Sequence, residues 1–242
     1  RADERRVRCV KRFYKSVGVA EEESGFSIRL DERPVKTPAK NPLLLPNRPL
    51  AEAVANEWDE QPEDIDTYKM RLTRLANSAI DRVTEHRDAV IREVAGFADT
   101  DLVCYRAADP VPLAERQEEG WGPLVSWVAD RHGIEFTITT GLLPVDQSAS
   151  SLMAVEAVVK SFDVFSLAGL HLVTSACGSI VLGLAVADGR IDGASAWELS
   201  LIDETFQIDN WGEDPEATKR RAGLLDDITA AAEYLRLCKA VH

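Results

Sequence analysis

The sequence predicts an α+β protein, in which a small β-rich N-terminal domain packs on a larger, mainly α-helical C-terminal domain. Alternating apolar residues and turn-forming residues dominate the first fifty positions, whereas apolar residues at three- and four-residue steps dominate the rest. The 242 residues, 45% of them hydrophobic, suffice for a substantial core. We place the domain boundary so that the β-rich domain covers residues 1–66 and the helical domain residues 67–242.

The β-rich part begins with an ambiguous segment. Residues 7–17 carry apolar side chains at helical steps but could equally open a strand, and both readings stay open. Residues 26–30 alternate apolar and polar, 31–34 have turn chemistry and 35–37 are extended again, which together predict a β-hairpin. The leucines at 43–45 lie between two prolines, which suits a further short strand or edge segment.

A short helix is expected to close the β-rich part. Asn47 is a favourable N-cap residue and Pro49 suits a first helical turn. Helix-forming residues then run over 51–61 until Pro62 ends them.

Most of the remaining chain reads as helix. A brief extended stretch at 134–138 could return to the sheet. Asp81, at the end of the helical sequence RLANSAID, is expected to cap a helix or to pair between the domains. The apolar spacing predicts helices over residues 72–83, 86–98, 113–119 and 124–132, from 148 onward, around 197–202, and over 224–237.

Residues 164–187 contain no charged side chain, and these 24 residues are long enough for a membrane span. Three serines, three glycines, Thr174 and His171 interrupt the run, and its flanks, Asp163 and Asp188, are acidic rather than basic. We therefore favour a central buried helix and expect no stable membrane insertion.

The charge balance argues against nucleic acid as a partner. The net charge is −13, with +5 over residues 1–50, −12 over 51–187 and −6 over 188–242, so few cations are available to neutralise phosphates. The four cysteines are far apart and have no metal-ligand spacing, which favours reduced thiols. With no secretory signal and no clear transit peptide, we expect either a bacterial cytoplasmic protein or a trimmed mature chain.

The sequence contains no recognisable catalytic motif. Ser195, in the sequence Gly-Ala-Ser-Ala-Trp, lacks the final glycine of a nucleophile elbow and fits an ordinary turn between helices. His171 lies in the uncharged run, where a satisfied core histidine is the more common case. We predict no catalytic residue, no metal site and no cofactor. The alternative is a hydrolase or isomerase that combines the carboxylates of Glu57 and Asp59 with His171.

Two clusters of polar and aromatic residues are candidate binding sites. Glu57, Trp58, Asp59 and Gln61 belong to a dense run, EWDEQ, at the end of the short helix. Glu204, Gln207 and Trp211 are spaced to share one helical face, with Gly212 as the stop. Trp58 could be an interface anchor or could dock its helix in the core.

Six motifs are distributed along nearly the whole chain. They are RFYKSV (12–17), LDERPVKTPAKNPLLLP (30–46), EWDEQ (57–61), MRLTRLANSAID (70–81), VFSLAGLHLVTSACGSIVLGLAV (164–186) and DETFQIDNWGE (203–213). Together they resemble the mitochondrial-type F1-ATPase assembly chaperones, specifically those that attend the alpha subunit. Arg71 stands where the family usually has proline, and Ala217 and Thr218 stand where many members have His-Asp.

The resemblance implies a non-enzymatic chaperone without nucleotide or metal. It would bind the unassembled alpha subunit and shield its subunit interface until the beta subunit replaces it. It also implies a monomer when free, with partner-binding residues Glu204, Gln207, Trp211, Glu57, Trp58, Asp59 and Gln61.

Overall fold

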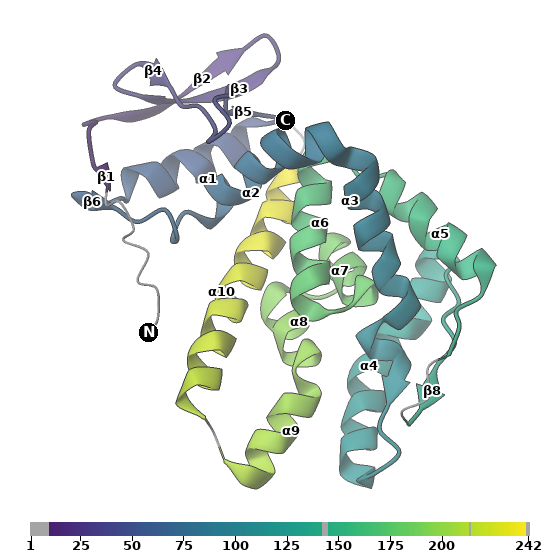
Figure 1. The fold of residues 1–242 in the computed structure, drawn as a ribbon. Coiled ribbons are helices and arrows are strands. Elements are labelled where there is room, and N and C mark those ends of the chain that lie inside the picture. The colour runs from purple at the N-terminus through teal and green to yellow at the C-terminus, as the bar shows by residue number, and fades with distance from the viewer. Residues whose placement is uncertain (1–9, 142–144, 213, 241–242) are drawn as a thin grey trace.

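The computed structural model describes residues 10–141, 145–212 and 214–240. Its N-terminal part is built on one antiparallel sheet, in which β2 (Val17–Glu22), β3 (Gly25–Leu30) and β4 (Arg33–Pro34) are consecutive and β5 (Leu44–Leu45) also pairs with β3 (Figure 1). The small sheet beside a larger helical part confirms the predicted α+β class.

The hairpin differs from the predicted one. The main partner of β3 is β2, for which the sequence gives only a weak signal, because valines there alternate with Gly18 and Ala20 rather than with polar residues. The strand that follows the turn, β4, lies at 33–34 rather than at the predicted 35–37. Asp31 and Glu32 form the turn, both with positive φ (45° and 67°), as a two-residue hairpin requires. The predicted short strand at 43–45 is confirmed as β5.

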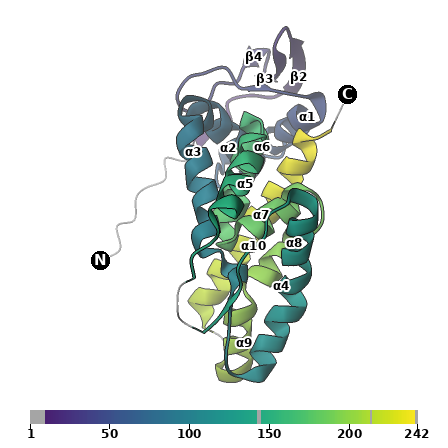
Figure 2. The same cartoon turned by 90° about the vertical axis from the view of Figure 1, so that its right-hand side faces the viewer.

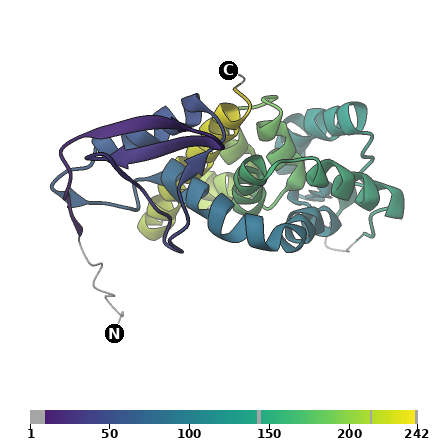
Figure 3. The same ribbon diagram turned by 90° about the horizontal axis from the view of Figure 1, so that it is seen from above.

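For the described part of residues 7–17 the open choice is settled against a helix, with strand only at its two ends and neither helix nor strand at 12–16. β1 (Val10–Lys11) pairs antiparallel with β6 (Asp64–Ile65), and residues 7–9 lie outside the described residues. The next predicted helix is confirmed as α1 (Arg48–Asp59), whose N-cap Asn47 accepts a hydrogen bond from the Leu50 amide at 2.9 Å. Seen from above, the sheet lies over α1 (Figure 3).

The helical part packs around two central helices, α6 and α7 (Figure 2). The boundary that we propose between residues 66 and 67 directly follows β6. The remaining elements are α2 (Arg71–Ser78), a π-helical turn (Ala79–Val83), α3 (Thr84–Gly96), 3₁₀ turns (Phe97–Thr100 and Leu102–Cys104), β7 (Tyr105–Arg106), α4 (Val111–His132), β8 (Thr139–Thr140), α5 (Ala149–Lys160), α6 (Val164–Cys177), α7 (Ile180–Ala187), α8 (Gly193–Ser200), α9 (Ile202–Trp211) and α10 (Pro215–Cys238).

The sequence predictions for residues 113–138 are wrong, and the single helix expected around 197–202 is two helices, α8 and α9. The two helices expected at 113–119 and 124–132 are one helix, α4, which continues through Pro123 because Trp121 is fully buried and its Nε1 donates to the Leu199 carbonyl at 2.8 Å. The extended stretch at 134–138 does not return to the N-terminal sheet. It leads instead to β8, which pairs parallel with β7.

The uncharged run is mostly buried, as predicted, but it is two helices rather than one. Gly178, with φ of 66°, ends α6, and Ser179 caps α7 through a hydrogen bond from the Leu182 amide at 3.1 Å. All eight residues of α7 are buried. Within the described part of the chain, each helix is too short or too polar to cross a bilayer.

Candidate functional site

Helix α9 carries the predicted face of Glu204, Gln207 and Trp211. None of its ten residues, all of which the structure describes, is buried, and Trp211 at its end is 79% exposed. Gly212 ends the helix with φ of 91°, as predicted. The helix lies at the opposite end of the molecule from the sheet (Figure 1).

Two arginines of α10 hold Glu204 in place. The Glu204 Oε1 atom lies 2.9 Å from Arg220 Nη2 and 3.9 Å from Arg221 Nη1. Arg221 is largely buried, donates to Thr205 Oγ1 at 2.9 Å and lies over the Trp197 ring at 5.3 Å. Glu204 is therefore oriented by its neighbours while it remains partly exposed.

A hollow of about 600 Å³ separates α9 from the start of α10. Gln207 is exposed and makes no side-chain hydrogen bond to any described residue, so its amide is available to a partner. The lining includes Glu204, Gln207, Ile208, Trp211, Ala217 and Arg220. Charged, amide and aromatic groups thus face one open space, as in a protein interface with an aromatic anchor.

Glu57, in the other predicted cluster, has an intramolecular role. Its carboxylate accepts hydrogen bonds from the amides of Leu72 and Thr73, both at 2.8 Å, and from the Thr73 hydroxyl at 2.7 Å. It therefore caps the first turn of α2, where Met70 provides no side-chain cap. Burial raises the pKa of Glu57, and these hydrogen bonds oppose the rise.

The other members of this cluster also have partners within the chain. Arg12 donates to the Asp59 carboxylate at 3.1 Å and to the Gln61 carbonyl at 2.7 Å. The buried Gln61 side chain accepts from the Asp66 amide at 2.8 Å, and Trp58 is partly buried beside Tyr14 with ring centroids 5.9 Å apart. Partner binding by these residues stays a prediction, and we do not include them in the surface proposed below.

The residues of the alternative catalytic site are not brought together. His171 Nε2 lies 3.1 Å from Glu93 Oε1, and no hydrogen bond or ion pair among the described residues links His171 to Glu57 or Asp59. Ser195 lies in the first turn of helix α8 rather than in the predicted turn between helices, and its amide donates to the N-cap residue Asp192. Within the described residues, no three His, Cys, Asp or Glu side chains are grouped so as to hold a metal ion.

The sequence did not reveal Arg220 and Arg221 as the residues that orient Glu204. They lie 16 and 17 positions away on another helix, so no local spacing signals the contact. Arg71, one departure from the family pattern, pairs with Asp226 at 2.9 Å and with Asp227 at 2.8 Å, and so ties α2 to α10.

Comparisons with known proteins agree with this architecture. A family model described as ATP12 chaperone protein matches residues 11–129. The structure of Atp12 from Paracoccus denitrificans is 44% identical with a TM-score of 0.91, and the match covers 95% of this chain and 98% of that one. A variant of the P. denitrificans protein with one aspartate-to-lysine substitution gives 43% identity, the same TM-score and the same coverage.

A more distant relative is also similar over most of its length. Protein atp12, mitochondrial, from Schizosaccharomyces pombe is 23% identical over 240 residues, which cover 94% of this chain and 82% of the relative. The matches therefore span both the sheet and the helical part. This chain belongs to the ATP12 chaperone family.

Proposed function

We propose that this chain is an assembly chaperone of the F1 part of ATP synthase, and that it holds the unassembled alpha subunit until the beta subunit replaces it. Membership in the ATP12 chaperone family supports the chaperone role. The alpha subunit as client follows from the motifs that resemble the alpha-specific assembly chaperones. An unassembled subunit of a hexamer exposes interface surface that is prone to aggregate, and a chaperone must cover this surface reversibly.

The α9 surface, defined as Glu204, Gln207 and Trp211 with the hollow beside them, is the client-binding surface in this proposal. The exposed Trp211 on a helix without a buried residue is the observation that carries it. A large aromatic side chain left in water provides binding free energy once a partner covers it. The carboxylate of Glu204 and the amide of Gln207 would add specificity more than affinity, which suits a client that has to be released.

We propose that the chain works without catalysis, without a cofactor and as a monomer when free. The separation of His171 from Glu57 and Asp59 supports a binding protein over the alternative hydrolase or isomerase. The same proposal places the protein in the bacterial cytoplasm or in the mitochondrial matrix, in keeping with a relative named as mitochondrial.

The test is capture of alpha subunit from the native lysate by the tagged wild-type chain and by two variants, Glu204→Lys and Trp211→Ala. We expect the wild type to retain unassembled alpha subunit and both variants to lose most of it. Tyr68→Ala is the matched control, because Tyr68 is also a well-exposed aromatic residue but lies far from α9 in the sequence and outside its hollow. Equal capture by all four proteins would exclude the α9 surface, and absence of alpha subunit from the wild-type sample would exclude the client.

A further inference from the structure

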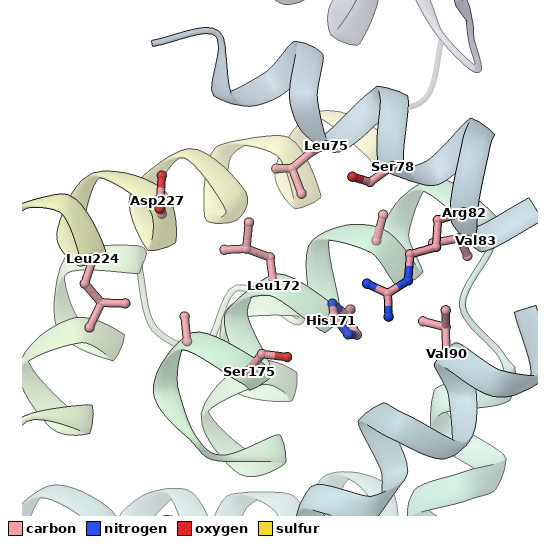
Figure 4. A pocket seen from close by; sticks show the side chains of 12 residues that line it. Leu75, Ser78, Arg82, Val83, Val90, His171, Leu172, Ser175, Leu224 and Asp227 are labelled. Carbon is pink, nitrogen blue, oxygen red and sulfur yellow. The ribbon is translucent and has the colours of Figure 1, made fainter. Parts of the chain in front are cut away.

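A groove in the helical part lies outside the α9 surface. Residues from α2 and its π-helical turn, from α3, from α6 and from α10 surround a cavity of about 400 Å³ (Figure 4). Its apolar lining includes Leu75, Val83, Val90, Leu172 and Leu224. This volume is sufficient for one or two large apolar side chains of a partner.

The groove leaves one face of the central helix α6 uncovered. A helix without charged residues is expected to be enclosed on all sides, and most of α6 is buried. Leu172 and Ala176 are only partly buried and Ser175 is exposed, and all three line the cavity. Figure 4 shows Leu172 and Ser175 directed into the space between α6, α2 and α10. This face of α6 therefore lacks the cover that neighbouring helices give to the rest of it.

The opposite wall is irregular where it meets the groove. Residues Ala79–Val83 form a π-helical turn, and His86, within α3, has non-helical angles (φ −121°, ψ 33°) that kink this helix near its start. Such turns are rare and are often found at functional sites, because they change the direction in which side chains project. Here the turn contributes Arg82 and Val83 to the lining.

Ion pairs neutralise most of the charged groups around the groove. At one end, Arg82 lies 2.7 Å from Glu93, which in turn lies 3.1 Å from His171. The proximity of His171 lowers the pKa of Glu93. At the other end, the two aspartates of α10 already described neutralise Arg71.

Arg74 is the exception at this rim. It lines a smaller hollow that shares Leu75, Ser78, Leu172 and Asp227 with the groove. Its side chain is exposed and forms no ion pair or hydrogen bond with any residue that the structure describes. Arg71, Arg74, Asp226 and Asp227 together carry no net charge, and Arg74 is the member of this group that has no partner among the described residues.

We infer that this groove is a second client contact, which binds an amphipathic helical segment of the alpha subunit. The apolar side chains of that segment enter between α2, α6 and α10. A carboxylate side chain of the same segment pairs with Arg74. The wall from Arg71 to Arg82 spans twelve residues, or about 16 Å from end to end, which matches about three turns of a bound helix. Recognition would follow the helix-in-groove mode, with apolar anchors at helical spacing. This inference rests on the proposed function.

The first test fills the groove. Ser175→Trp places a large ring in the cavity without replacing a buried residue, and Ser150→Trp puts the same ring on the exposed start of α5. We expect Ser175→Trp to raise the Kd for purified alpha subunit at least tenfold and Ser150→Trp to change it less than twofold. If wild type and Ser175→Trp bind alpha subunit equally, the groove inference is overturned while the proposed function stands. If the wild type does not bind alpha subunit, the proposed function fails as well.

The second test reverses the free charge. Arg74→Glu and Arg33→Glu change the net charge by the same amount, but Arg33 lies on β4, away from the groove lining. We expect Arg74→Glu to weaken alpha-subunit binding about tenfold at low salt and Arg33→Glu to have little effect. An equal effect of the two variants would exclude the carboxylate contact. Thermal unfolding midpoints within a few degrees of wild type would show that all four variants fold.

Discussion

Glu57 joins two helices through a single carboxylate. It extends from α1 to accept two backbone amides and one hydroxyl at the start of α2, and it replaces the missing side-chain cap there. Helix caps of this kind contribute about 1 kcal/mol, and a buried acceptor of three hydrogen bonds contributes more.

Removal of this cap is expected to destabilise the protein. Glu57→Ala should lower the free energy of unfolding by about 2 kcal/mol, because buried amides of α2 lose their acceptor. Glu60→Ala, at an exposed residue of the same charge three positions along, should change it by less than about 0.5 kcal/mol. Urea unfolding of both variants gives the comparison, and equal losses would contradict the capping role.

Asp101 makes the free energy of unfolding depend on pH. It is fully buried and accepts hydrogen bonds from the Val103 and Val181 amides, both at 3.1 Å. Burial raises its pKa from 3.8 to about 6, so between these values the folded protein binds a proton that the unfolded chain does not. The contribution of Asp101 to stability therefore increases as the pH falls through 6 and is lost as the pH rises.

Unfolding free energies of the wild type and of Asp101→Asn, measured at pH 7 and at pH 5, test this sign. The advantage of the wild type over the variant should be about 1 kcal/mol larger at pH 5 than at pH 7. Other titrating groups contribute equally to both proteins and cancel in the difference. A smaller advantage at pH 5 would contradict the raised pKa.

At the scale of elements, α6 packs closely against α10. A Cβ atom added at Gly169 would lie 2.8 Å from Leu235 Cγ and 3.2 Å from Tyr234 Cδ1, so these side chains of α10 lie directly against the backbone of α6. Gly223, also within α10, has no atom within 4 Å of the corresponding position.

The same substitution at these two glycines should have effects of opposite sign. Gly169→Ala should lower the unfolding free energy by about 1–3 kcal/mol, because Leu235 and Tyr234 have to shift. Gly223→Ala should raise it by up to about 1 kcal/mol, because alanine favours the helix and meets nothing. Chemical unfolding of both variants is the measurement, and a stabilising Gly169→Ala would show that the contact is loose.

Elements with strong local signals could be predicted, and contacts distant in sequence could not. Asn47 and Gly212 mark helix ends because capping depends on neighbouring residues, and helical spacing alone places Glu204, Gln207 and Trp211 on one face. The local sequence pattern does not predict strand β2 or the continuous helix α4, because Gly18 and Pro123 weaken it. Contacts with residues distant in sequence determine the secondary structure there.

The candidate site divides in the same way. The exposed face of α9 follows from the sequence, but the arginines that orient Glu204 and the groove beside α6 require helices that meet only in the folded chain. The role of Glu57 was likewise hidden, because its partners lie 15 and 16 positions away.

At the scale of the whole molecule, side chains connect the sheet to the helical part at several points. Asn47 Nδ2 donates to the Leu237 carbonyl at 2.9 Å, near the end of α10. Asp81 accepts from Thr37 Oγ1 at 2.6 Å and from Asn41 Nδ2 at 2.9 Å, as expected of a residue that pairs between the two parts. These hydrogen bonds hold the sheet at one end of the molecule, and α9 lies exposed at the other end (Figure 1).

The central claim is that the chain holds the alpha subunit until the beta subunit replaces it. The most direct test measures the transfer of alpha subunit from the chaperone to the beta subunit. Purified chain and alpha subunit are mixed, the complex is isolated by size-exclusion chromatography, and beta subunit is then added. The account predicts a soluble complex that the beta subunit dissociates, and the Trp211→Ala variant should form little of it. A wild-type chain that forms no complex with alpha subunit, or a complex that beta subunit leaves intact, would contradict the account.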